Sequence, residues 1–231
     1  MEPAIRRERS KIMRTIRVTG KANLKVKPDI TRITVTAEKT YPEYGEALEG
    51  SAKDTSLLGE LLAEFGFERA DLKTLDFNVD TEYEGYNENG VYKQRFIGYR
   101  ARHVMKVEFD SDNDRLGKIL YALANYPVKP EFRISYTVKD PESAKKELLA
   151  AAVKDATEKA AVLAQAAGVK VKWIRMIDYS QKQIDLEVRP VNRIMAEDCA
   201  PMMAKSAGFD MDLEPEDIEV SDTVTVLWEI G

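Results

Sequence analysis

The sequence contains one pattern twice, in which a strand is followed by a long helix and two further strands, and this repeat constrains the fold more than any other feature. The first helix is predicted between Pro42 and Gly66 and the second between Pro141 and Gly168. Proline suits the first helical turn because its missing N–H would have no partner there, and glycine tolerates the left-handed conformation after a helix. We therefore predict an α+β fold: duplicated β-α-β-β units, mainly antiparallel sheet with long helices packed on it, preceded by an extra N-terminal strand.

The predicted organisation is one domain behind a short arm. The boundaries are a basic N-terminal arm at 1–14 and a single domain at 15–231, built of two copies at about 29–109 and 130–230 that a helix at about 112–125 bridges. Apolar and polar residues alternate from Ile16 to Val26 and again from about 32 to 38, which predicts two strands paired as a hairpin. A second hairpin turn is predicted near Asn87–Gly90, and a closing strand at Ile218–Ile230.

The second long helix carries a row of alanines at four-residue spacing: Ala152, Ala156, Ala160 and Ala164. Residues four apart lie on the same face of a helix, and small side chains let another backbone approach closely. We therefore expect this face to pack tightly on a sheet.

Composition excludes several classes of protein. The 231 residues carry 35 basic and 40 acidic side chains, a formal charge of −5, whereas dedicated nucleic-acid binders usually carry a basic excess. No run of about twenty apolar residues is present, so no membrane span is predicted. The single cysteine, Cys199, excludes an intramolecular disulfide. We expect a cytoplasmic protein, or a periplasmic or secreted one if a signal was removed.

A set of short motifs in a fixed order resembles the SIMPL-domain family, whose bacterial members include periplasmic immunogenic and oxidative-stress-associated proteins. The motifs are Ile16-x-Val18-x-Gly20 followed by Pro28-Asp29, Thr74-Leu75-Asp76-Phe77-x-Val79, Gly98-Tyr99-x-Ala101, the alanine row before Gly168, and Val224-x-Val226. The resemblance covers nearly the whole chain. It implies a mixed α+β fold without an established catalytic site, a tendency to self-associate, and a link to oxidative stress.

No catalytic or cofactor-binding residues are predicted. His103 is the only histidine and falls on the apolar face of its strand, which favours a packed, hydrogen-bonded core histidine over a catalytic base or metal ligand. The usual glycine-rich phosphate loops are missing from the sequence. Asp110, Asp112 and Asp114 imitate the start of a calcium loop, but helix capping explains them better. We expect a protein that is not an enzyme and holds no metal or cofactor.

A methionine-rich segment offers an alternative. Thioether and thiolate sulfurs are soft ligands suited to copper(I), and the candidates are Met195, Cys199, Met202 and Met203. The preferred interpretation is that these flexible side chains dock on the core or on a neighbouring subunit. A redox-sensing Cys199 is a third reading, which its acidic neighbours disfavour.

The hairpin around the Asn87–Gly90 turn mixes aromatic and basic residues: Tyr83, Tyr86, Tyr92, Phe96 and Tyr99 with Lys93, Arg95, Arg100 and Arg102. Such a mixture can stack and clamp single-stranded nucleic acid. A structural or subunit-contact hairpin is favoured instead because the chain is acidic. The predicted subunit contacts are Tyr86, Tyr92, Phe96, Met202 and Met203.

The leading hypothesis is a non-enzymatic, self-associating homo-oligomer of undefined biochemical role, with a stress connection implied by the resemblance. The alternative is a small-molecule, copper(I) or nucleic-acid binding module in stress protection. The sequence identifies no protein partner other than a second copy.

Overall fold

The structure is a computed structural model that describes residues 14–127, 130–180, 184–189 and 213–231. The chain forms two compact units, and each is described by itself. One unit comprises the residues up to Val26 together with Asp140–Leu186 and Ile218–Gly231, and the other comprises Lys27–Lys139 and Glu187–Asp217.

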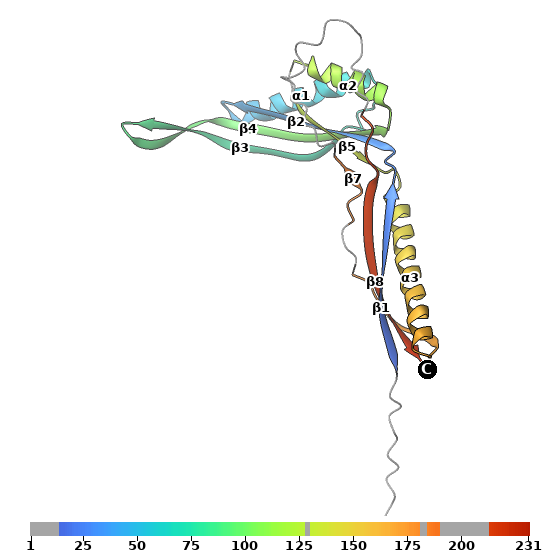
Figure 1. Ribbon diagram of the computed structural model, residues 1–231. Coiled ribbons are helices and arrows are strands. Elements are labelled where there is room, and N and C mark those ends of the chain that lie inside the picture. Colours follow the sequence, from blue (N-terminus) through green and yellow to red (C-terminus); the bar gives the residue numbers. More distant parts are fainter. Residues whose placement is uncertain (1–13, 128–129, 181–183, 190–212) are drawn as a thin grey trace, which may run out of the picture. The chain divides into compact units, whose positions relative to one another are not determined.

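The larger unit is a five-stranded antiparallel sheet covered by two helices. Its strand order is β3-β4-β2-β5-β7. The strands are β2 (Ile30–Tyr41), β3 (Lys73–Glu88), β4 (Val91–Asp110), β5 (Glu131–Thr137) and β7 (Glu187–Val188). The helices α1 (Tyr44–Ala63) and α2 (Asn113–Ala124) lie on one face of this sheet (Figure 1).

Apolar side chains between that face and the helices form the core of the larger unit. Alternation along β2 and β4 directs every second side chain toward the helices. The i, i+3, i+4 spacing in α1 and α2 directs the apolar side chains of the helices toward the sheet. The most deeply buried members include Ile33, Val35, Leu62, Met105, Val107, Leu116, Ile119 and Leu123. This packing fixes the base of β4, with which β3 pairs to form the candidate site.

The smaller unit is a three-stranded antiparallel sheet with one long helix. Its strands are β1 (Thr15–Val26), β8 (Ile218–Ile230) and β6 (Val171–Asp178), in the order β1-β8-β6. The helix α3 (Pro141–Ala166) lies along β1 and β8 (Figure 1). The predicted alanine row faces the sheet, and Ala152, Ala156 and Ala160 are fully buried.

The α+β fold is confirmed, as are a helix at Asn113–Ala124, the Asn87–Gly90 turn and the closing strand, whereas the bridging of two copies by that helix stays a prediction. Asn89 and Gly90 both have positive φ, 54° and 78°, the conformation of a two-residue hairpin turn. Asp112 caps α2, since its Oδ1 accepts a hydrogen bond from the Arg115 backbone N–H at 3.0 Å. None of the helices in the described part of the chain is long and apolar enough to cross a membrane.

The predicted hairpin between the first two strands is wrong. β1 pairs with β8, whereas β2 pairs with β4 and β5 in the other sheet. Alternation reveals a strand but not its partner, and β8 matches β1 over twelve consecutive positions with both apolar rows beneath α3.

Two details of the predicted repeat differ as well. Pro141 begins α3 as expected, but Glu43 is the N-cap of α1, so Pro42 lies before that helix. The strands β3 and β4 follow α1 and share its sheet. In contrast, β5 precedes α3 yet pairs with β2, and β1 lies beside β8. The duplication therefore stays a prediction.

Candidate functional site

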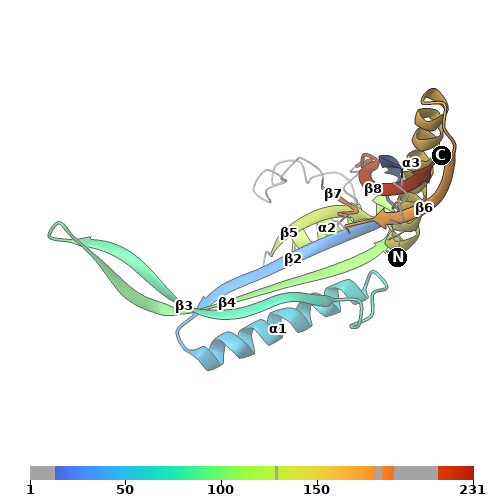
Figure 2. The ribbon, with the colours of Figure 1, turned by 90° about the horizontal axis from the view of Figure 1, so that it is seen from below.

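The β3–β4 hairpin continues as a two-stranded ribbon beyond α1 and β2 (Figures 1 and 2). From Asp80 to Ile97 nearly every residue is exposed. In the register, Tyr83 lies opposite Phe96, Gly85 opposite Gln94, and Tyr86 opposite Lys93. Because successive side chains of a strand point to opposite faces, this register divides the ribbon into two chemically different faces.

The first face carries a row of aromatic rings, which we call the aromatic face: Tyr83, Tyr92, Phe96 and Tyr99. Edge-to-face contacts join Tyr83 to Phe96 with centroids 5.7 Å apart, and Phe96 to Tyr99 with centroids 5.3 Å apart. The row ends at the first residue of α1, where the Tyr99 and Tyr44 rings meet at 5.5 Å. Each such contact contributes about 0.5–1.5 kcal/mol beyond area burial, so the rings hold one another in place.

Tyr92 occupies the part of this face nearest the turn. Its ring crosses to the other strand at Gly85, where a Cβ atom would lie only 2.1 Å from the Tyr92 hydroxyl oxygen. The ring remains 66% exposed because nothing in the described part of the chain covers its outer side. Tyr86, also predicted as a subunit contact, falls on the opposite face by alternation.

The opposite face carries cross-strand ion pairs. Lys93 pairs with Glu88, and the Arg95 Nε donates to Glu84 at 2.8 Å. Arg102 donates to Asp76 at 3.1 Å, and Arg100 lies 3.6 Å from Glu38. These are the four cations considered for nucleic-acid binding. Each has a carboxylate partner that already compensates its positive charge. Less charge is therefore left to bind a phosphate backbone.

His103 holds the base of the ribbon against α1. The Thr55 hydroxyl donates to the Ser51 carbonyl at 2.8 Å, so at 2.9 Å from the His103 Nδ1 its oxygen accepts a hydrogen bond. The proton of the neutral ring is therefore on Nδ1, and Nε2 accepts from the Thr74 hydroxyl at 2.9 Å. Burial lowers the pKa of His103, which favours this neutral form. The predicted packed, hydrogen-bonded core histidine is confirmed.

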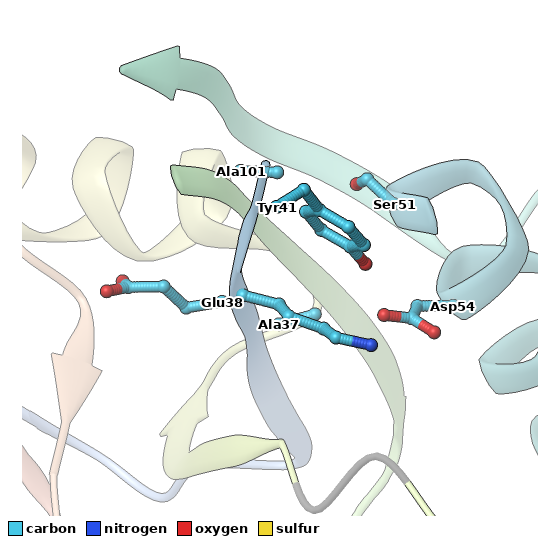
Figure 3. Close-up of a pocket in the computed structure, with 7 residues that line it drawn as sticks. Ala37, Glu38, Tyr41, Ser51, Asp54 and Ala101 are labelled. Carbon is cyan, nitrogen blue, oxygen red and sulfur yellow. The ribbon is translucent and has the colours of Figure 1, made fainter. Parts of the chain in front are cut away.

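A small hollow lies between β2 and α1, and its lining includes Tyr41, Ser51 and Asp54 (Figure 3). Its empty space is about 180 Å³ including space open to solvent, below the roughly 300–1,000 Å³ of typical ligand pockets. The Tyr41 ring fills the approach to α1, since a Cβ on Gly50 would lie 2.3 Å from its hydroxyl oxygen. Burial, with a smaller effect of Asp54, raises the pKa of Tyr41. The hollow is therefore a packing feature and gives the small-molecule alternative no support.

The predicted sulfur ligands Met195, Cys199, Met202 and Met203 lie outside the described residues, so the copper(I) alternative and two of the predicted contacts stay predictions. Among the described residues there is no group of three or more His, Cys, Asp or Glu side chains that could hold a metal ion. Of the three aspartates that imitate a calcium loop, Asp112 caps α2 and Asp110 pairs with Lys139 at 3.0 Å.

Sequence reasoning found Tyr92 and Phe96 but missed the residues that organise them. No local signal marks Tyr44, because it belongs to the helix and its contact with Tyr99 depends on tertiary packing. The space that Gly85 leaves for the Tyr92 ring is detectable from the sequence. Counting outward from the Asn89–Gly90 turn places Gly85 on the strand that pairs with the Tyr92 strand.

Two antiparallel sheets, one of which extends into an amphipathic ribbon, define this chain as a mixed α+β protein whose most distinctive surface is an exposed aromatic row. The chain belongs to the SIMPL family: the family described as "SIMPL: Protein of unknown function (DUF541)" matches residues 16–228. The predicted resemblance is thus confirmed. A search of curated proteins gave no match.

Proposed function

We propose that the protein works as a non-enzymatic, self-associating assembly in which the aromatic face of the β3–β4 ribbon is a subunit contact. The observation that carries this proposal is the exposure of an ordered aromatic row on a two-stranded ribbon: Tyr83 is 55%, Tyr92 66% and Phe96 46% exposed. Aromatic residues at an exposed patch are typical of protein–protein interfaces.

The stability of the ribbon supports the same proposal. A two-stranded hairpin is only marginally stable in water, because one face of each strand gains no burial. Within the described part of the chain, the helices cover the sheet and not the outer ribbon (Figure 2). An apolar partner laid on the aromatic face would turn the ribbon into one half of a two-layer packing, which is the arrangement that stabilises amphipathic strands.

A second copy of the chain is the partner that the ribbon fits best. The aromatic face lacks charged residues among Tyr83, Gly85, Tyr92 and Phe96, so two such faces can meet without burying unpaired charge. The ion pairs stay on the outside, where water solvates them. Such a contact uses the same patch on both copies, which is the commonest form of homodimer contact.

The test is the solution mass of the full chain, measured by size-exclusion chromatography with light scattering across a range of concentrations. We expect the intact chain to be an oligomer and a Tyr92→Ser, Phe96→Ser double variant to have a smaller mass. The control is Tyr121→Ser on α2, an aromatic residue of similar exposure at 42% that lies off the ribbon. Circular dichroism checks that both variants keep the fold.

A monomeric intact chain would overturn the proposal. An unchanged mass in the double variant would show that the aromatic face is not the contact. Equal mass loss in the Tyr121→Ser control would count against a specific surface.

A further inference from the structure

The middle of the aromatic face carries one polar side chain, that of Gln94. Three cross-strand pairs follow one another on this face of the ribbon: Asn87 with Tyr92, Gly85 with Gln94, and Tyr83 with Phe96. Gly85 has no side chain, so Gln94 alone represents the middle pair. It is exposed and lies between Tyr92 and Phe96 on its own strand. A partner laid on the rings therefore covers Gln94 as well.

Covering the Gln94 amide sets a condition on the partner. Within the described part of the chain this amide forms no hydrogen bond, so water solvates it in a single copy. A donor or acceptor that is buried without a partner loses its hydrogen bonds to water and gains nothing in return. A stable contact on the aromatic face must therefore offer both a donor and an acceptor at its centre.

A second Gln94 meets this condition, because a primary amide is complementary to its own copy. The Nε2–H of each glutamine can donate to the Oε1 of the other, which gives two reciprocal hydrogen bonds. Facing sheets lie about 10 Å apart, a gap across which two extended glutamine side chains meet end to end. The two amides meet only if the two-fold axis of the contact passes through the middle pair.

The position of Gln94 favours one of two ways in which two ribbons can stack face to face. With the two-fold axis across the ribbon, β4 lies antiparallel over β4 of the second copy. Gln94 then faces Gln94, and Tyr92 faces Phe96. With the axis along the ribbon, Gln94 faces Gly85 instead, where the Tyr92 ring already fills the space of the missing side chain. The amide would be buried there without a hydrogen-bond partner.

We propose that Gln94 determines the register of the subunit contact. Two ribbons stack antiparallel about a two-fold axis at Gly85 and Gln94, and the two Gln94 amides hydrogen-bond to each other. This inference rests on the proposed self-association and names the residue that makes it specific. A single polar pair within an apolar contact fixes the register of coiled coils in the same way, since every other register leaves the polar group unpaired.

The first test replaces the amide by a carboxylate of the same shape in the full chain. Gln94→Glu places two negative charges face to face, so it should raise the dissociation constant about tenfold or more at about pH 8, measured by analytical ultracentrifugation. This loss should shrink toward about pH 5, because two facing carboxyl groups share a proton and pair again. The matched control is Asn78→Asp, the same change opposite Arg102 on the polar face of the hairpin, which should have an effect of less than about threefold.

The second test locates the axis by cross-linking in a Cys199→Ser background. Gln94→Cys leaves no amide to desolvate, so the rings still hold the contact, and a thiol reagent that spans about 10 Å should join the two copies. Asn87→Cys on the same face should not be joined. It lies two residues from the middle pair, so an antiparallel stack separates the two cysteines by a further distance of about 13 Å along the strands.

The outcomes separate this inference from the proposed function. The ribbon contact stands and the Gln94 pairing falls if the Tyr92→Ser, Phe96→Ser variant dissociates while Gln94→Glu associates as tightly as Asn78→Asp. Equal cross-linking of both cysteine variants, or none of Gln94→Cys, would likewise overturn the pairing alone. A monomeric intact chain, or an unchanged mass of the double variant, would overturn the pairing together with the ribbon contact.

Discussion

The Asp155 carboxylate on α3 accepts a hydrogen bond from the backbone N–H of Lys21 on β1, with an oxygen–nitrogen distance of 2.7 Å. β1 lies at the edge of its sheet, and this N–H would otherwise be an unpaired donor there. Lys159 adds to the cap, since its ammonium pairs with Asp155 at 2.7 Å and lies 3.5 Å from the Thr19 carbonyl oxygen. Covering an edge strand in this way prevents unwanted pairing. At Lys21 the β1 edge is thus capped by α3, whereas none of the described strands pairs with the outer edge of β6.

The edge cap predicts a dependence of stability on pH. The hydrogen bond from Lys159, followed by that from the Lys21 backbone, lowers the pKa of Asp155 in the folded chain. A lowered carboxyl pKa stabilises the fold above the unfolded value of about 3.9, and this contribution is lost as pH falls through the folded pKa. Asp155→Asn should reduce the acid sensitivity of the melting temperature, measured between about pH 2 and pH 6.

The matched control for the edge cap is Glu158→Gln on the exposed side of the same helix. It removes one carboxylate without touching β1. If this control changes the acid dependence as much as Asp155→Asn does, general charge and not the edge cap is responsible.

The sequence predicted the strands and helices well because their signals are local. The alternation in Ile218–Ile230 and the alanine row depend only on which residues face the core, and both predictions are confirmed. The partner of β1 could not be predicted in the same way, because β8 follows it by almost two hundred residues and alternation is identical in every half-buried strand.

In the candidate site, too, the local features could be predicted and the contacts between distant segments could not. Tyr92 and Phe96 stood out by composition, and the Asn89–Gly90 turn sets their register. The ion pairs from Arg100 and Arg102 to carboxylates on neighbouring strands depend on strand order, so the sequence left the nucleic-acid alternative open. The aromatic face as a subunit contact remains a prediction that solution measurements must test.

One added methyl group at Gly20 should lower the stability of the fold severely. A Cβ at this position would lie 2.0 Å from the Ala152 carbonyl oxygen and 2.5 Å from the Ala156 nitrogen, both backbone atoms of α3. The helix would have to move away from β1. We expect Gly20→Ala to lower the free energy of unfolding by about 1–3 kcal/mol, measured by urea denaturation.

Gly45→Ala is the control for this substitution, because a Cβ there meets nothing within 4 Å and the residue lies in α1. It should be neutral or stabilising by up to about 1 kcal/mol, since alanine favours helix more than glycine does. Equal stability of the Gly20→Ala variant and the unaltered chain would contradict the close approach of α3.

At Arg115, even a substitution that keeps the positive charge should lower the stability of the fold. Its guanidinium lies 4.2 Å from the centroid of the Phe67 ring and 5.1 Å from that of Phe109, and it donates to the Phe65 carbonyl at 2.8 Å. Lysine cannot stack as a plane on the rings while it donates to that carbonyl. Arg115→Lys should therefore destabilise the fold by about 1–2 kcal/mol in urea denaturation. Lys118→Arg, on an exposed position of the same helix, should change stability by less than about 0.5 kcal/mol, and a similar loss there would contradict a specific role for Arg115.

A second dependence of stability on pH is expected from His103. It is simple to measure because this chain has a single histidine. Burial lowers its pKa, so the folded state favours the neutral ring between Thr55 and Thr74. The resulting stability is fully present above the unfolded pKa of about 6.5 and is lost as pH falls through the lower folded value. Nitrogen chemical shifts from NMR should show the neutral Nδ1–H form at pH 7 and protonation only below about pH 6.5, and His103→Gln should remove this part of the acid dependence. A folded-state pKa above the unfolded value, or an Nε2–H tautomer at neutral pH, would contradict the hydrogen-bond arrangement that fastens β3 and β4 to α1.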